Sequence, residues 1–163
     1  MNFSNEQLPG YTITEFTSLD DAEWKAKVES SMDKETKWDK LVENGGLVKV
    51  EGDYTWTMGA NPCMGALVSV DNELYILHSR AWKLTDEQIK FLEENDFDYG
   101  VVGGGHRGLR ENKELFEKKG IKILKNPDTR EYTTEEIEVT VDFRIAVQGN
   151  QISYGYFNGG DKI

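Results

Sequence analysis

The chain has 163 residues, of which 37% are hydrophobic and 30% are charged, and its formal net charge is −11. This length and composition are typical of one globular domain with a sizeable core. Because an acidic surface repels phosphate groups and anionic lipids, nucleic acids and membrane surfaces are poor candidate partners, whereas a basic protein would be attracted. No apolar run approaches the roughly 20 residues of a transmembrane helix.

Cys63 is the only cysteine, so an intrachain disulfide is excluded and folding needs no oxidising compartment. The first residues lack the basic and apolar segments of a signal peptide. We therefore expect cytoplasmic residence, with export by a route that has no readable signal left open. One cysteine and two widely spaced histidines make a poor zinc site, so we expect neither a metal nor a cofactor.

The predicted elements begin with a short strand within residues 11–18 and a helix over residues 18–46, with Ser18 as N-cap and a break near Asp33. Four β-rich runs follow, separated by Gly, Asn and Asp. The last two of these runs read as a hairpin with its turn at Asp71-Asn72. The runs cover residues 47–52, 54–59, 66–71 and 74–79.

The second half alternates helices and strands before a strand-rich end. Thr85 and Gln88 form a capping box at the start of a helix. The next elements are a strand leading into a glycine turn, a helix stopped by Gly120, another strand, and two or three final strands with a turn at Gly149-Asn150. Because the strands are numerous and clustered, an α+β fold in one domain over residues 1–163 is predicted.

Residues 103–108 read GGGHRG, which formally matches a dinucleotide-binding turn between a strand and a helix. The context does not fit, because there is no second nucleotide-binding half and the acidic Asp128 falls in a turn. The plainer interpretation is a tight connection that needs positive φ or close packing. Helix N-termini also suit anions, so four residues of this turn are candidates for lining a site: Gly103, Gly104, Gly105 and His106.

Residues 57–63 read TMGANPC and place Cys63 after an irregular turn. A lone cysteine in apolar surroundings is most often buried and inert. Glycine, asparagine and proline before it can instead lift the thiol out of the sheet and direct backbone N–H groups at one point, as an oxyanion hole requires. The candidate residues for this turn and its donors are Gly59, Asn61 and Met64.

The predicted hairpin brings Cys63 and His78 towards the same open end of a strand pair. Thr57 ends the preceding strand, and its hydroxyl or carbonyl is positioned to hold the His78 ring and fix its tautomer. We interpret these three residues as a candidate catalytic site. His106 competes for the role of base, and its simpler interpretation is a histidine in a surface turn.

The pattern T-x-G-x-x-x-C, followed by a strand pair ending in histidine, resembles the chemotaxis receptor glutamine deamidases (the CheD family). It is also similar to the catalytic domains of the cytotoxic necrotizing factor toxins. VVGGG followed by GLRENKELFEKKGIKIL is similar to the CheD segment in which a glycine turn leads into a helix and a strand. The likeness covers roughly residues 56–124.

The resemblance implies a three-layer α/β/β sandwich with mixed sheets. It further implies a deamidase-like core over residues 51–163, preceded by an N-terminal helical extension of about residues 1–50. The implied activity is hydrolysis of glutamine side chains in a protein substrate, of the chemoreceptor or the effector and toxin type, with Cys63, His78 and Thr57 as catalytic residues and no cofactor. Two alternatives stay open: a non-catalytic acidic interaction or regulatory protein, and a thiol hydrolase of other amides.

Overall fold

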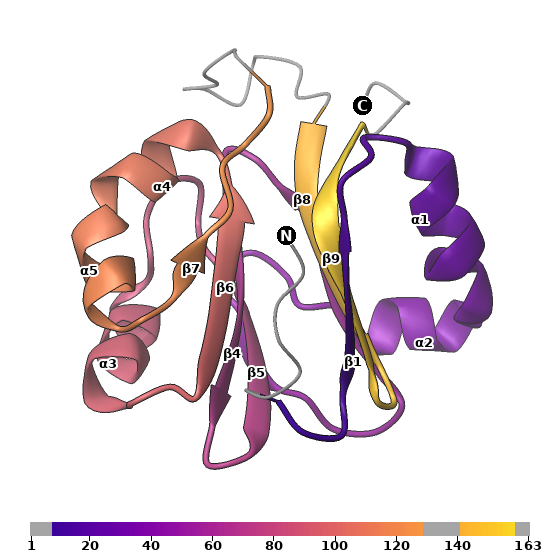
Figure 1. The fold of residues 1–163 in the computed structure, drawn as a ribbon, viewed down its shortest axis with the longest axis horizontal. Coiled ribbons are helices and arrows are strands. Elements are labelled where there is room, and N and C mark those ends of the chain that lie inside the picture. Colours follow the sequence, from indigo (N-terminus) through magenta and orange to yellow (C-terminus); the bar gives the residue numbers. More distant parts are fainter. Residues whose placement is uncertain (1–7, 129–140, 159–163) are drawn as a thin grey trace.

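The computed structural model describes residues 8–128 and 141–158, which form two stacked β-sheets (Figure 1). Both sheets are mixed, because each contains one parallel pair at its edge. Sheet A has the strand order β1 (Thr12–Phe16), β9 (Gln151–Asn158), β8 (Val141–Gln148) and β3 (Tyr54–Ala60). Sheet B has the order β2 (Leu47–Lys49), β5 (Glu73–His78), β4 (Met64–Val70), β6 (Tyr99–Gly104) and β7 (Lys122–Ile123).

Helices lie on the outer face of each sheet (Figure 1). Sheet B is covered by α3 (Asp86–Glu94), α4 (His106–Glu111) and α5 (Lys113–Lys118), and sheet A by α1 (Asp21–Lys27), the 3-10 turn η2 (Glu29–Ser31) and α2 (Lys34–Asp39). The predicted α+β fold is confirmed. The layer order is α/β/β/α, however, and the predicted three layers omit the N-terminal helices. These helices pack because Trp24 and Val28 bury their side chains against Trp56, Ala146 and Phe157 of sheet A.

Side chains that bond backbone N–H groups set the helix starts. Thr85 accepts from the Gln88 N–H while Gln88 accepts from the Thr85 N–H, which confirms the predicted capping box. The helix predicted over residues 18–46 is divided into short segments, and the break near Asp33 is confirmed because Asp33 caps α2. Asp20 caps α1, so the prediction of Ser18 as N-cap was wrong. The Ser18 hydroxyl accepts from the Asp20 N–H instead.

The hairpin of β4 and β5 has the predicted turn. Asp71 and Asn72 have φ values of 51° and 65°, and both positive values fit the two-residue turn that matches the twist of paired strands. Val70 therefore lies opposite Glu73, and the pairing continues until Gly65 lies opposite His78. This register carries His78 to the end of the hairpin that adjoins Cys63.

The described part of the N-terminal extension belongs to both sheets. β1 pairs in parallel with β9 of sheet A, and β2 pairs with β5 of sheet B. Leu8 and Val42 are buried in the apolar cluster between the sheets. The predicted turn at Gly149-Asn150 joins β8 to β9. Any strand predicted within residues 129–140 lies outside the described residues.

Candidate active site

The residues that precede Cys63 cross from sheet A to sheet B, because β3 belongs to one sheet and β4 to the other. A bulge interrupts β3 before this crossing: Thr57 lies opposite Ile145, but Ala60 lies opposite Phe143. Two residues of β3 thus face one residue of β8. Gly59 takes a φ of 76° there, a left-handed conformation that glycine adopts without strain.

The glycine run of residues 103–105 closes on the backbone of the Cys63 loop. A Cβ atom on Gly104 would lie 2.3 Å from the Cys63 carbonyl oxygen, and one on Gly105 would lie 2.8 Å from the Pro62 carbonyl oxygen. A Cβ on Gly103 would lie 2.5 Å from the Phe143 ring. This close packing explains why glycines are needed here, so no bound nucleotide is required to account for them. It also places the glycine run against the candidate site, as predicted for a site-lining turn.

Thr57 and His78 are in direct contact between the two sheets. The Thr57 hydroxyl lies 2.7 Å from the Val42 carbonyl oxygen and 2.7 Å from His78 Nδ1. Because the hydroxyl has one proton and a carbonyl can only accept, the hydroxyl donates to Val42 and accepts from an Nδ1–H group. This fixes the tautomer in which His78 Nε2 carries no proton. The predicted contact between Thr57 and the ring is therefore present.

The Nε2 atom of His78 is buried and has no hydrogen-bond partner among the described residues. Burial lowers the pKa of His78 to about 4, because the surroundings cannot solvate the imidazolium form. The ring is therefore neutral near pH 7. An unpartnered buried acceptor costs about 1–3 kcal/mol, and such exceptions call for a physical explanation.

Cys63 lies next to the end of the hairpin that carries His78. The antiparallel pairing continues past His78, because the Ser79 N–H donates to the Met64 carbonyl. Cys63 is two positions before Gly65, which lies opposite His78, and it directly precedes the first residue of β4. The thiol is buried. A thiol–imidazole hydrogen bond would satisfy Nε2, and that bond is not formed.

The Cys63 N–H and that of a neighbour were predicted as oxyanion donors, and the amides of three candidate turn residues are engaged elsewhere. Gly59 N–H donates to the Asp142 carboxylate, and Asn61 N–H donates to the Gly59 carbonyl. Met64 N–H donates to the Ser79 hydroxyl. Asp142 and Ser79, from outside the turn, satisfy two of these amides, because buried N–H groups need partners. The predicted preformed hole of Gly59, Asn61 and Met64 is therefore not available in this conformation.

His106 has a different set of neighbours. Its Nε2 atom is hydrogen-bonded to the Asp128 carbonyl, far along the chain. In the same region the Asn126 side chain donates to the Gly104 carbonyl. His106 therefore connects the glycine turn to the segment after β7, whereas the ring of His78 is held by Thr57 through one nitrogen only.

A cavity of about 380 Å³ reaches His78, and its other lining residues are Leu41, Val42, Glu43, Asn44 and Met58. Its size lies in the range of pockets that admit small ligands or side chains. Sequence reasoning missed the segment 41–44, including the Val42 carbonyl that orients Thr57. The segment lies between a helix and a strand and carries no catalytic motif, so no sequence signal could have found it.

Within the described residues, no group of three or more His, Cys, Asp or Glu side chains is placed to hold a metal ion. Nor does any helix in residues 8–128 or 141–158 have the length and apolar character to cross a membrane. No family model, curated protein or solved structure matches this chain.

Proposed function

We propose that this protein is a cysteine hydrolase that deamidates glutamine side chains of a protein substrate in the cytoplasm. Cys63 is the nucleophile, His78 the general base, and Thr57 orients the base. One observation carries the proposal: the buried His78 is held by Thr57 through Nδ1, while its Nε2 atom has no partner among the described residues, at the end of the hairpin next to the only cysteine. The motif resemblance to CheD-type and toxin-type deamidases supports the same roles.

The reaction begins when His78 Nε2 takes the thiol proton and Cys63 Sγ attacks the carboxamide carbon of glutamine. A carbon–sulfur bond forms, and the electron pair of the C=O bond moves to oxygen. The tetrahedral intermediate collapses as the imidazolium gives its proton to the departing nitrogen, which releases ammonia. His78 then deprotonates a water molecule, which attacks the thioester carbon. Glutamate leaves, and the thiol regains its proton.

The environment of His78 favours proton transfer during attack over a resting ion pair. Burial lowers the pKa of His78 to about 4, so a permanent imidazolium beside a thiolate is disfavoured. The Nε2 lone pair is unprotonated over the whole physiological range, but a base with a pKa of about 4 accepts a proton less readily than one with a pKa near the working pH. Thr57 contributes by keeping the proton on Nδ1 and the lone pair on Nε2.

Mass spectrometry of candidate substrate proteins tests this proposal. Incubation with the protein should produce the mass gain of amide-to-acid conversion at specific glutamines, and Cys63→Ser should abolish that gain while the protein stays folded. His106→Gln is the matched histidine control and should retain activity, whereas His78→Gln should not. An identical signal from Cys63→Ser would remove the proposal, and turnover of small amides alone would indicate a thiol hydrolase of another class.

A non-catalytic interaction protein is the second candidate, because Cys63 is buried and the amides of its turn are engaged. A thiol-selective reagent applied to the native protein separates the two functions. The hydrolase requires labelling of Cys63 at neutral pH in the folded state. The interaction protein requires that Cys63 is labelled only after unfolding.

A further inference from the structure

A second buried polar cluster lies on the outer face of sheet A, under helix α1. The Arg144 side chain is only 2% exposed. Its guanidinium donates to both carboxylate oxygens of Asp142, at 3.0 and 3.1 Å, and to the Asp21 carboxylate at 2.5 Å. It also lies over the rings of Trp24 and Phe157. A buried guanidinium is tolerated here because opposite charge and ring faces surround it.

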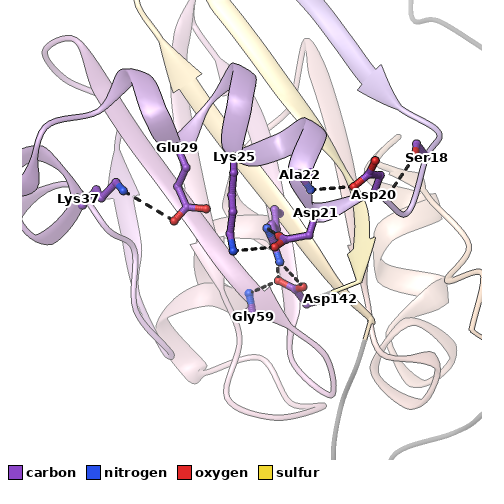
Figure 2. Close-up of polar contacts among 10 residues, drawn as sticks. Ser18, Asp20, Asp21, Ala22, Lys25, Glu29, Lys37, Gly59 and Asp142 are labelled. Carbon is purple, nitrogen blue, oxygen red and sulfur yellow. Dashed lines mark hydrogen bonds and ion pairs between the residues drawn. The ribbon is translucent and has the colours of Figure 1, made fainter. Parts of the chain in front are cut away.

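Asp142 also contacts the backbone of the bulge beside the candidate site. Its Oδ2 atom accepts from Arg144 Nε and from the Gly59 N–H, the latter at 2.7 Å (Figure 2). Gly59 is the left-handed residue of the bulge in β3. The carboxylate therefore joins a buried charge on one face of sheet A to the backbone that precedes Cys63.

The bulge decides which way the neighbouring side chains point. Thr57 and Ala60 are three residues apart, so in a regular strand they would face opposite sides of the sheet. The extra residue at the bulge lets both lie on the inner face, opposite Ile145 and Phe143, which are buried between the sheets. Thr57 can thus contact His78 while the chain leaves Ala60 in the direction that Cys63 needs.

Helix α1 completes the arrangement through Asp21. Its carboxylate binds Arg144 and forms an ion pair with Lys25 at 2.9 Å (Figure 2). The helix is anchored at this end, because the Asp20 side chain accepts from the Ala22 N–H. The N-terminal helices are therefore connected through side-chain contacts to the strand that holds Thr57.

We propose that Asp142 is a positioning residue of the candidate site, which fixes the Gly59 bulge and thereby the contact between Thr57 and His78, while Arg144 and Asp21 hold its carboxylate in place. The inference deepens the proposed function and rests on it for the meaning of the site. It assigns a role to the N-terminal helical layer, which the motif residues alone do not require.

Nuclear magnetic resonance of the His78 ring nitrogens measures this role directly, because it reports the tautomer that Thr57 fixes. Asp142→Ala removes the acceptor of the Gly59 N–H. Asp142→Asn can keep that acceptor while losing the charge, since its amide oxygen can occupy the Oδ2 position. Gln148→Ala is the matched control: Gln148 also ties β8 to the N-terminal helices, through Val28 and Ser31, but does not touch Gly59.

We expect Asp142→Ala to lower the fraction of the Nδ1–H tautomer and to slow alkylation of Cys63 by iodoacetamide by on the order of tenfold or more, as small misplacements of reacting groups do. Asp142→Asn and Gln148→Ala should leave both readouts near those of the unaltered protein. An unchanged His78 ring in Asp142→Ala would overturn the inference. Equal changes in Gln148→Ala or Asp142→Asn would overturn it too, since they would indicate a general loss of stability.

Asp142→Ala leaves Arg144 with one partner fewer, so this variant can fail to fold. The double variant Asp142→Leu with Arg144→Met removes both charges and the acceptor together, and such replacements of buried ion pairs are often well tolerated. It should show the same change in the His78 tautomer, and a native tautomer there would overturn the inference. Because the tautomer is read without substrate, this outcome is separate from a failure to find deamidation.

Discussion

Two buried polar clusters flank strand β3, and they differ in how completely their members are satisfied. On the outer face of sheet A, the Arg144 guanidinium is bound by the carboxylates of Asp142 and Asp21. On the inner face, Thr57 and His78 carry no charge, and His78 Nε2 has no partner among the described residues. Gly59 links the two clusters, because its N–H donates to Asp142.

This difference in hydrogen bonding indicates a structural role for the outer cluster and a chemical role for the inner one. Buried polar groups are almost always paired, so a complete set of partners indicates a cluster that fixes the fold. A buried base with an unused lone pair is available to a ligand. Other buried atoms, among them Trp24 Nε1 beside Arg144, also have no partner among the described residues. We therefore expect changes in the outer cluster to act mainly on stability and changes in the inner cluster mainly on reactivity, with Asp142 affecting both.

The largest expected effect is on the outer cluster. Arg144→Met leaves Asp142 buried beside Asp21 without its cation, and it should lower the free energy of unfolding by about 3–5 kcal/mol. Urea unfolding followed by circular dichroism measures this loss. The double variant Asp142→Leu with Arg144→Met should recover most of it. If the double variant is as unstable as the single one, the pairing of these charges does not explain what the cluster contributes to the free energy of unfolding.

The inner cluster should make stability depend on pH. Folding lowers the pKa of His78 from 6.5 to about 4, so between these values the unfolded chain binds more protons and stability falls as pH falls. The full loss is about 3 kcal/mol. Urea unfolding of the unaltered protein and of His78→Gln across this range isolates the contribution. Parallel pH curves for the two proteins would show that His78 titrates normally.

Removing the hydroxyl of Thr57 should have a smaller effect on stability. Thr57→Val leaves the His78 Nδ1–H and the Val42 carbonyl without their partner, at a cost of about 1–3 kcal/mol. The ring also loses the contact that sets its tautomer, so alkylation of Cys63 should slow. Thr57→Ser retains the hydroxyl and should preserve the alkylation rate. Equal rates in the valine and serine variants would contradict the orienting role of Thr57.

The smallest expected change in stability comes from replacing either of two glycines that adopt the same left-handed backbone conformation. Gly59 and Gly149 both have left-handed φ values, and an added Cβ would meet nothing within 4 Å at either position. Alanine at each should cost about 1–2 kcal/mol through backbone strain alone. Only Gly59→Ala should also alter the ring-nitrogen resonances of His78, because Gly149 lies in the turn between β8 and β9. Similar His78 ring-nitrogen resonances in both variants would contradict a role of the bulge in positioning the site.

Local signals in the sequence predicted much of the fold. The left-handed Asp71-Asn72 turn, the capping box of Thr85 and the β-rich runs separated by Gly, Asn and Asp each depend on neighbours within a few positions. The hairpin register placed His78 near Cys63, whereas the role of Thr57 was predicted from its place at the end of the preceding strand. These features are encoded where they occur, so a single sequence reveals them.

The remainder depends on residues far apart in the chain. Asp142 and Arg144 alternate with apolar residues in β8, a pattern typical of a strand face exposed to water. They are buried because α1 covers that face, and the partner Asp21 lies more than a hundred residues away. The contact of Thr57 with the Val42 carbonyl and that of the Met64 N–H with Ser79 each span 15 residues and join different elements. No local sequence pattern predicts such pairings.

The alkylation rate of Cys63 in the folded protein, compared with that of His78→Gln, tests the central claim most directly. At about pH 6 an unperturbed histidine would be mostly protonated, whereas His78 should remain a neutral base because burial lowers its pKa to about 4. We predict that iodoacetamide labels Cys63 faster in the unaltered protein by on the order of 10²-fold. Equal rates in the two folded proteins would contradict the assignment of Cys63 and His78 as nucleophile and base.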